Sequence, residues 1–267
     1  MNIWIALGAL WMASALMMTL GWRWQLRRRN AGIVDVLWAS GLGAAAVLLG
    51  LTGAGAAVPR LMLEILGGVW GARLAGHLWR RVGTEPEDGR YRYLRAHWQD
   101  DQGKFFGFFQ LQAVLIVLFS LPFLAVAGNP TPGFTVWSAV GLTLWTVSLA
   151  GESLADRQLA RYRANPAHRG RTCREGLWRF SRHPNYFFEW LHWLTYVALA
   201  VGSPMMWLSW TGPVVMYVFL RWVSGVPFTE AQALRTRGDD YRLYQKETPS
   251  FFPWFPRRSV NVTNGRE

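Results

Sequence analysis

In Gly176-Leu177-Trp178-Arg179-Phe180-Ser181-Arg182-His183-Pro184-Asn185-Tyr186-Phe187-Phe188-Glu189-Trp190, an arginine-rich loop leads directly into an apolar stretch. Pro184 has a fixed φ and no amide hydrogen, and both properties suit the first turn of a helix. In that helix Asn185 and Glu189 lie one turn apart on one face. Because a glutamate near hydrocarbon is costly without a partner, we expect this segment to place polar chemistry at a membrane edge.

The rest of the chain has the composition of an integral membrane protein. Its 267 residues are 51% hydrophobic and 15% aromatic, and the apolar residues come in long runs. Each run is close to the length that crosses about 30 Å of hydrocarbon, so we predict an all-α protein with seven transmembrane helices. The expected spans are residues 2–21, 31–51, 61–79, 105–127, 133–154, 185–202 and 204–224.

Basic residues predict the orientation of these spans. Of the 28 lysines and arginines, Arg60 falls in an outer loop, and Arg73 and Arg221 fall within spans. The remaining 25 all lie on one side of the seven-span arrangement. By the positive-inside rule we expect a multi-pass protein with the N-terminus outside and the C-terminus in the cytoplasm.

Charge and cysteine content argue against several other classes. The net charge of +12 raises the possibility of nucleic-acid binding, but the arginines are spread over membrane-proximal loops, so we expect no nucleic-acid partner. Cys173 is the single cysteine, which excludes an intramolecular disulfide, and no cysteine-histidine cluster supports a metal site. Nothing in the sequence indicates an obligate protein partner.

A run of small residues needs a separate interpretation. Gly41-Leu42-Gly43-Ala44-Ala45-Ala46 resembles a dinucleotide fingerprint, but it lies inside an apolar span with no preceding strand. We predict that these small residues let two helices approach each other closely.

Ionisable residues inside or at the rim of the spans are candidates for function, because hydrocarbon disfavours them. Two of them, Glu152 and Asp156, are one helical turn apart and are followed by several arginines. Carboxylates beside guanidiniums can bind an uncharged polar group and a phosphate together, although an ordinary helix-end charge network is the alternative. Bidentate arginines suit pyrophosphate and a ribose 2′-phosphate. The full set is Asp35, Glu64, Arg73, His77, Glu152, Asp156, Glu189, His192, Arg221 and Glu230.

A second polar region follows the third expected span. Arg73, His77 and either Arg80 or Arg81 share a helix face there. The residues from Glu87 to Arg95 mix acidic, basic and aromatic side chains, which favours a ligand-clamping loop over a simple spacer, although interfacial anchors have the same composition. We therefore expect cofactor contacts from Arg80, Arg81, Asp88, Arg90, Tyr91 and Arg95.

With the Gly176–Trp190 segment and Glu152-x-x-x-Asp156 considered together, the chain resembles the steroid 5α-reductase C-terminal-domain family, close to its bacterial membrane branch. The resemblance covers most of the chain and is strongest from Gly151 onward, where Ser-Arg-His-Pro-Asn-Tyr followed by Glu-Trp is also shared with sterol reductases. It implies a seven-helix protein that binds NADPH from the cytoplasmic side. The implied reaction reduces a carbon-carbon double bond conjugated to a ketone in a lipid, with a 3-oxo-Δ4 steroid as the expected substrate.

The resemblance also implies roles for individual residues. Within a single membrane domain of residues 1–267, about 1–130 would hold the substrate and proton donors, and about 131–267 would hold the cofactor. Glu152 stands where the steroid enzymes carry an asparagine. The residues expected at the cofactor by position or by membership of the shared motif are Glu152, Asp156, Arg163, Arg171, Arg182, His183, Asn185, Tyr186 and Glu189.

Catalysis in such an enzyme needs a donor to the ketone. The resemblance implies a glutamate in the second helix and a tyrosine in the third, and this chain offers Asp35 for the former and His77 or Leu78 for the latter. We predict that Asp35 is protonated within the membrane and donates to the ketone, with His77 as a second donor, because burial in hydrocarbon favours the neutral acid. A structural hydrogen bond from Asp35 to a neighbouring helix is the alternative.

Two other functions compete with the reductase. Arg-His-Pro-x-Tyr followed by a glutamate also occurs in membrane methyltransferases of the isoprenylcysteine or phospholipid type, which bind S-adenosylmethionine. The arginines from Arg157 to Arg174 favour NADPH, because S-adenosylmethionine carries no phosphate. A transporter or receptor is disfavoured because repeated halves and interrupted mid-membrane helices are not evident, and the polar residues gather at the cytoplasmic rim.

Overall fold

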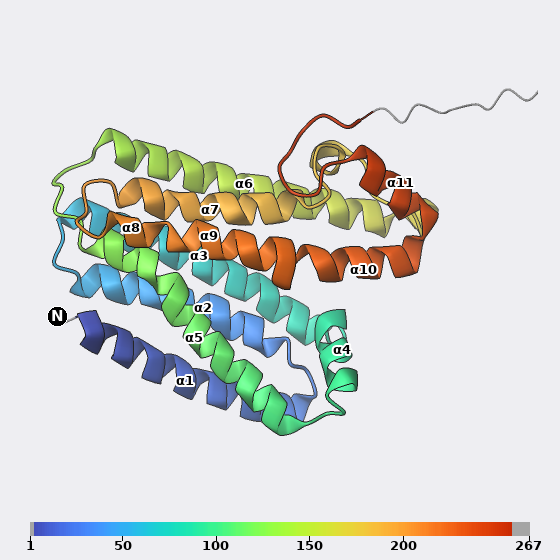
Figure 1. The fold of residues 1–267 in the computed structure, drawn as a ribbon, viewed down its shortest axis with the longest axis horizontal. Helices are drawn as coiled ribbons and strands as arrows, with labels where there is room; N and C mark the ends of the chain where they lie inside the picture. Colours follow the sequence, from blue (N-terminus) through green and yellow to red (C-terminus); the bar gives the residue numbers. More distant parts are fainter. Residues whose placement is uncertain (1–2, 258–267) are drawn as a thin grey trace, which may run out of the picture. The chain divides into compact units, whose positions relative to one another are not determined.

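The computed structural model describes residues 3–257, and these fold into helices joined by turns, with no strand among them (Figure 1). The all-α prediction is therefore confirmed for this part of the chain. The six long helices are α1 (Ile3–Arg28), α2 (Ile33–Thr52), α3 (Ala57–Thr84), α5 (Gln102–Ala127), α6 (Val136–Ala164) and α7 (Pro184–Leu199). Shorter ones are α4 (Gly89–His97), α8 (Met206–Ser209), α9 (Thr211–Val218), α10 (Val226–Arg237) and α11 (Asp239–Glu247).

Three of the described helices, α1, α2 and α5, are both long and apolar enough to cross a membrane. In the most apolar 18-residue stretch of α1, only 17% of the residues are buried inside the protein. Trp4, Ile5 and Leu16 project from it with more than half of their surface exposed. A helix with so much exposed apolar surface is stable in hydrocarbon and not in water, which supports a membrane protein.

The last expected span, residues 204–224, is not one helix. The structure divides it into α8, α9 and a π-helical turn at Phe219–Val223. Pro213 lies in the first turn of α9, and Pro227 lies in the first turn of α10. Because proline has no amide hydrogen to donate, each marks the beginning of a new helix and not the continuation of the previous one.

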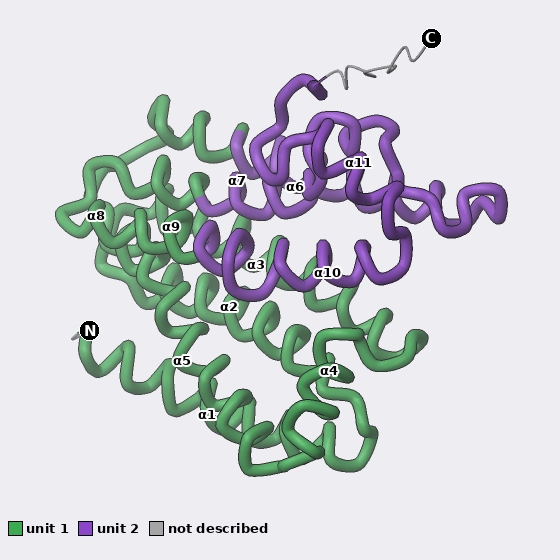
Figure 2. The backbone as a smooth tube through the Cα atoms, turned by 45° about the vertical axis from the view of Figure 1, so that its right-hand side comes forward, with its two compact units in different colours: residues 1–143, 194–215 green, residues 144–193, 216–267 purple. Residues whose placement is uncertain are grey.

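The chain forms two compact units, coloured separately in Figure 2. Unit 1 comprises residues 1–143 and 194–215, and unit 2 comprises residues 144–193 and 216–267. Unit 1 thus contains α1 to α5, and it also takes in the end of α7 with α8. Unit 2 contains the Gly176–Trp190 segment, most of α6 and α7, and α10 and α11.

Glycine allows a close contact between the backbones of α2 and α3 in unit 1. A Cβ atom added to Gly71 would lie 2.6 Å from the Cα atom of Gly43, and one added to Gly67 would lie 2.4 Å from the Cβ atom of Ala46. Both distances are too short for any side chain, so the two backbones touch directly. The prediction that the small residues around Gly43 serve close helix packing is confirmed.

Gly71→Ala is therefore expected to destabilise unit 1, because the new methyl group would overlap the backbone of α2. Overpacking of this kind costs about 1–3 kcal/mol, which lowers the thermal midpoint by several degrees. Thermal unfolding in detergent measures the change. Gly76→Ala is the matched control on the same helix, because its added Cβ meets no atom within 4 Å, and alanine improves helix propensity. A lower midpoint for Gly76→Ala than for Gly71→Ala would contradict the proposed close contact.

In unit 2, α6 and α7 lie side by side, and α10 packs on α11. A Cβ added to Gly151 on α6 would fall 2.3 Å from the ring of Phe188 on α7. Ala233, Tyr241 and Tyr244 form a small buried core between α10 and α11. The chain then runs back past the Gly176–Trp190 segment, where the amide of Trp254 donates to the carbonyl of Phe180 at 2.9 Å.

Candidate functional site

The loop before α7 is fastened to α6 by the residues that the sequence singled out. Gly176 adopts a positive φ of 57°, a conformation that favours glycine, at the start of a 3-10 turn over Gly176–Arg179. The amide of Leu177 donates to the Oε1 atom of Gln158 at 2.9 Å, and the indole of Trp178 donates to the carbonyl of Ala155 at 2.9 Å. The loop therefore has a fixed place against α6.

Helix α7 begins at Pro184, as the sequence predicts. Just before it, the Oγ atom of Ser181 accepts from the amide of His183 at 3.1 Å and donates to the carbonyl of Phe251 at 2.8 Å. The phenol of Tyr244 on α11 donates to the carbonyls of Trp178 and Ser181. These bonds hold the start of α7 between the loop and the C-terminal segment.

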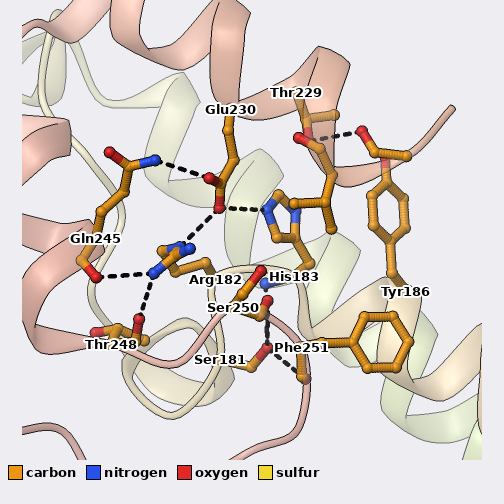
Figure 3. Close-up of polar contacts among 12 residues, drawn as sticks. Ser181, Arg182, His183, Tyr186, Thr229, Glu230, Gln245, Thr248, Ser250 and Phe251 are labelled. Atoms are coloured by element: carbon orange, nitrogen blue, oxygen red, sulfur yellow. Dashed lines mark hydrogen bonds and ion pairs between the residues drawn. The ribbon is translucent and has the colours of Figure 1, made fainter. Parts of the chain in front are cut away.

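Glu230 on α10 gathers the polar side chains of this region, as Figure 3 shows. One carboxylate oxygen accepts from the Nε atom of Arg182 at 2.7 Å and from the Nε2 atom of His183 at 3.2 Å. The other accepts from the amide of Gln245 at 2.7 Å. The Nη1 atom of Arg182 also donates to the carbonyls of Gln245 and Thr248 at 2.9 and 2.7 Å. We call Arg182, His183, Glu230 and Gln245 the Glu230 cluster.

Burial and hydrogen bonding fix the charges of the Glu230 cluster. Burial alone would raise the pKa of Glu230, but hydrogen bonds from His183 and Arg182 outweigh it and lower the pKa to about 2. Burial lowers the pKa of His183, and the neighbouring carboxylate only partly opposes this effect. The arrangement is therefore an ionised Glu230 that accepts from a neutral imidazole and a guanidinium.

Two helices bring together the other motif residues of unit 2. The amide of Asn185 on α7 donates to the Oδ1 atom of Asp156 on α6 at 3.2 Å. Glu152 is buried one turn before Asp156, and Glu189 is half-buried one turn after Asn185. The ring of Tyr186 stacks on His183, with 5.3 Å between centroids and an interplanar angle of 7°. Asp156 of α6 and Asn185 of α7 are thus in contact, with Glu152 and Glu189 one turn away along their helices.

The arginines between residues 157 and 182 fall into two groups. Arg174 and Arg182 bind acids of the same unit: Arg174 contacts Asp240 at 3.0 Å and Glu247 at 3.1 Å, and Arg182 contacts Glu230. The other group projects from α6 and the loops with exposed side chains, and it includes the expected phosphate ligands Arg163 and Arg171. Its members are Arg157, Arg161, Arg163, Arg169, Arg171 and Arg179.

In unit 1, the predicted catalytic carboxylate of Asp35 lies beside α4. Its Oδ1 atom accepts from the phenol of Tyr91 at 2.7 Å, and its Oδ2 atom accepts from the Nη2 atom of Arg90 at 3.1 Å. Asp88 binds Arg90 at 3.2 Å and Arg81 at 2.7 Å. Burial, followed by the charge of Asp35, raises the pKa of Tyr91 well above its usual range, so its phenol stays protonated.

A small pocket with a volume of about 20 Å³ opens among these groups, which is room for about one water molecule. Leu78 lines it together with Asp35, Arg81 and Tyr91, whereas His77 and Arg80 are exposed on α3 away from its lining. Of the two residues that the sequence left open for the third helix, Leu78 is therefore the one that faces Asp35.

Arg95 belongs to a separate network at the same end of unit 1. It binds Glu87 at 2.8 Å and also contacts Asp100, while Arg29 contacts Asp100 from the end of α1. The Oε1 atom of Glu87 accepts the amide of Ala31 at 2.7 Å. The segment expected to clamp a ligand thus also fastens the ends of α1, α2 and α4 together.

The sequence places Glu230 among the rim residues but gives it no role. It contains no sign of the contact of Gln245 with Glu230 or of the contact of Tyr91 with Asp35. Glu230 lies 47 residues from His183, and Tyr91 lies 56 residues from Asp35. No local spacing signals such contacts. The one available sign was composition, since a glutamate beside an apolar span needs a cationic partner.

Acidification is expected to lower the thermal midpoint of unit 2 in two phases. His183 has a lowered pKa in the folded protein, so the unfolded chain binds more protons and stability falls as the pH drops below about 6.5. Glu230 also has a lowered pKa, so its contribution is complete above about 4.5 and is lost as the pH falls toward 2. Thermal unfolding across this pH range measures both phases.

Glu230→Gln tests the second phase. It is expected to lower the midpoint at pH 7, because Arg182 loses its buried carboxylate, and to remove most of the loss below pH 4.5. Asp239→Asn is the control, because the Asp239 side chain is 92% exposed and pairs with the exposed Arg242. If the thermal midpoint of Glu230→Gln falls with pH in the same way as that of the unmodified protein, the loss below pH 4.5 does not come from Glu230.

Comparison with known proteins gives a family match and a distant relative. The model of the family described as "Protein of unknown function (DUF1295)" matches residues 21–248. The chain is similar to the uncharacterized protein C594.04c of Schizosaccharomyces pombe, with 26% identity over an alignment 265 residues long. The alignment covers 87% of this chain and 75% of the yeast protein. No solved structure matches.

Proposed function

The chain belongs to the family of proteins of unknown function DUF1295. From the geometry of its site, we propose that it is a membrane reductase that uses NADPH. Its substrate would be a lipid with a carbon-carbon double bond conjugated to a ketone, with a 3-oxo-Δ4 steroid as the first candidate. The contact between Asp156 and Asn185, beside a group of exposed arginines, is the observation that carries this proposal.

The residues of unit 2 fit the chemistry of such a cofactor. The carboxylates of Glu152 and Asp156 and the amide of Asn185 offer acceptors and donors for ribose hydroxyls and a carboxamide. Exposed guanidiniums, including Arg163 and Arg171, offer bidentate donors for phosphates. Arg182 and His183 would act indirectly, since their bonds to Glu230 and to backbone carbonyls hold the start of α7 in place.

When bound, NADPH would supply a hydride to the β-carbon of the double bond. We assign Tyr91 as the donor to the ketone, because its neutral phenol lies beside the pocket and is held by Asp35. The phenol donates to Asp35 at 2.7 Å in the structure, so on substrate binding its hydrogen would turn from the carboxylate to the ketone oxygen. The enolate oxygen would thereby be stabilised, and the α-carbon would take a proton from water.

The proposal includes the complete membrane arrangement. We propose seven membrane crossings in the bacterial inner membrane, in which α8, α9 and the π-helical turn together form the last. The N-terminus would be outside and the C-terminus in the cytoplasm. The support for this orientation is the distribution of basic residues, since Arg157, Arg171 and Arg179 would share the cytoplasmic side with Arg81 and the other loop arginines.

Purified protein is expected to be thermally stabilised by NADPH and not by S-adenosylmethionine. Ligand at a hundredfold excess over its Kd stabilises a protein by about 2.7 kcal/mol, which shifts the midpoint by several degrees. Arg171→Gln and Asn185→Ala are each expected to raise the Kd for NADPH about tenfold, because each removes a hydrogen-bonding group. Differential scanning fluorimetry with a titration of each ligand measures both effects.

Arg242→Gln is the matched control for charge, because Arg242 is exposed on α11 and its ion pair is with the exposed Asp239. Its Kd for NADPH is expected to equal that of the unmodified protein. Stabilisation by S-adenosylmethionine without stabilisation by NADPH would contradict the reductase proposal and support a methyltransferase.

Turnover tests the assignment of Tyr91. Tyr91→Phe and Asp35→Asn are expected to lower the rate of NADPH consumption with an enone about 100-fold or more, while binding of NADPH is retained. His77→Ala is expected to keep most of the rate, because His77 lies outside the pocket lining. The assay should include steroid, fatty and isoprenoid enones. Full activity of Tyr91→Phe, or loss of activity in His77→Ala alone, would return the donor role to His77.

A further inference from the structure

Residues 252–257, here called the aromatic strap, expose large apolar side chains outside any helix. Trp254 is 71% exposed, Phe255 is 73% exposed and Phe252 is 49% exposed. Pro253 lies between Phe252 and Trp254, and Pro256 lies between Phe255 and Arg257. Neighbouring aromatics so exposed are unfavourable in water. Tryptophan and phenylalanine beside arginine are typical of segments that lie at the membrane surface.

The backbone of the aromatic strap is fixed to the rest of unit 2. The amide of Trp254 donates to the carbonyl of Phe180 at 2.9 Å, and the amide of Arg257 donates to the carbonyl of Glu247 at 2.8 Å. The ring of Phe255 meets the ring of Phe180 edge to face at 5.9 Å. Because its backbone is already ordered, the strap would lose little conformational entropy on binding a surface.

The other end of the strap packs on helices that belong to the predicted spans. Phe252 stacks on Tyr217 of α9, with 5.8 Å between centroids, and meets Trp190 of α7 edge to face at 5.4 Å. The strap is therefore continuous with apolar helical surface. The strap ends at the exposed Arg257, and the exposed Arg179 directly precedes Phe180, whose ring contacts Phe255. The positive charge of both arginines is complementary to anionic lipid phosphates.

We propose that the aromatic strap binds the surface of a bilayer that contains anionic phospholipid. Trp254 and Phe255 insert among the headgroups, and Arg179 and Arg257 bind lipid phosphates. Through Phe180, this contact holds the loop of residues 176–183, which carries the motif. The proposal depends on the membrane location of the chain and not on the reductase activity.

Site-directed fluorescence tests the lipid contact. Trp254→Cys in a Cys173→Ala background would be labelled with an environment-sensitive fluorophore and reconstituted in nanodiscs that contain nitroxide-labelled lipid. The label is expected to be quenched, and more strongly when phosphatidylglycerol is present. The same label at Arg242→Cys on exposed α11 is the control and is expected to stay unquenched. Equal quenching at both positions, or quenching at neither, would overturn the proposal.

Two variants test the contribution of the arginine charges to lipid binding. Arg179→Gln and Arg257→Gln are each expected to raise about fivefold the share of phosphatidylglycerol that gives half-maximal quenching. Unchanged lipid dependence would overturn the role of the arginines. Energy transfer between labels on two copies of the chain, in place of lipid quenching, would identify a second copy as the occupant and overturn the lipid assignment.

Hydrogen exchange tests the link to the motif. In nanodiscs, Trp254→Ser with Phe255→Ser is expected to speed amide exchange in residues 177–183 several-fold. Exchange in α2 and α3 is expected to stay unchanged, and this serves as the check that the variant is folded. Unchanged exchange in residues 177–183 of a folded variant would overturn the link.

Discussion

The folded arrangement of unit 2 depends on one ionised carboxylate. Glu230 is 15% exposed, yet it stays charged because a guanidinium, an imidazole and an amide all donate to it. A buried charge that loses one of its partners is strongly destabilising, so these groups specify one another's positions. The start of α7, the first turns of α10 and the end of α11 are thereby joined at a single point.

From this point the positions of the other polar groups follow. Arg182 holds the carbonyls of Gln245 and Thr248, which fixes the chain where it turns back toward the motif loop. With the start of α7 held, Asn185 lies next to Asp156 on the neighbouring helix. Unit 1 uses the same device on a smaller scale, since Asp35 and Asp88 share Arg90 and thereby seat Tyr91.

Sequence periodicity and proline chemistry predicted more of the fold than of the site. Long apolar runs correctly located six helices, and Pro184 correctly located the start of the helix that carries the motif. The interruption after Ser209 was missed because the run from 204 to 224 is mostly apolar, with Arg221 as its one charged residue, and hydropathy does not register the missing amide hydrogen of Pro213. The contact of Tyr91 with Asp35 could not be predicted, because the sequence contains no sign that α4 folds back against the start of α2.

The bonds of Arg182 bear on why one motif occurs in proteins with different cofactors. The guanidinium has a structural role, because it donates to Glu230 and to two backbone carbonyls of its own chain. Such an arginine fixes the position of a helix end but does not determine which ligand binds there. Natural variation could then exchange the arginines and carboxylates around that helix end, and so change the cofactor, while Arg-His-Pro itself stays the same.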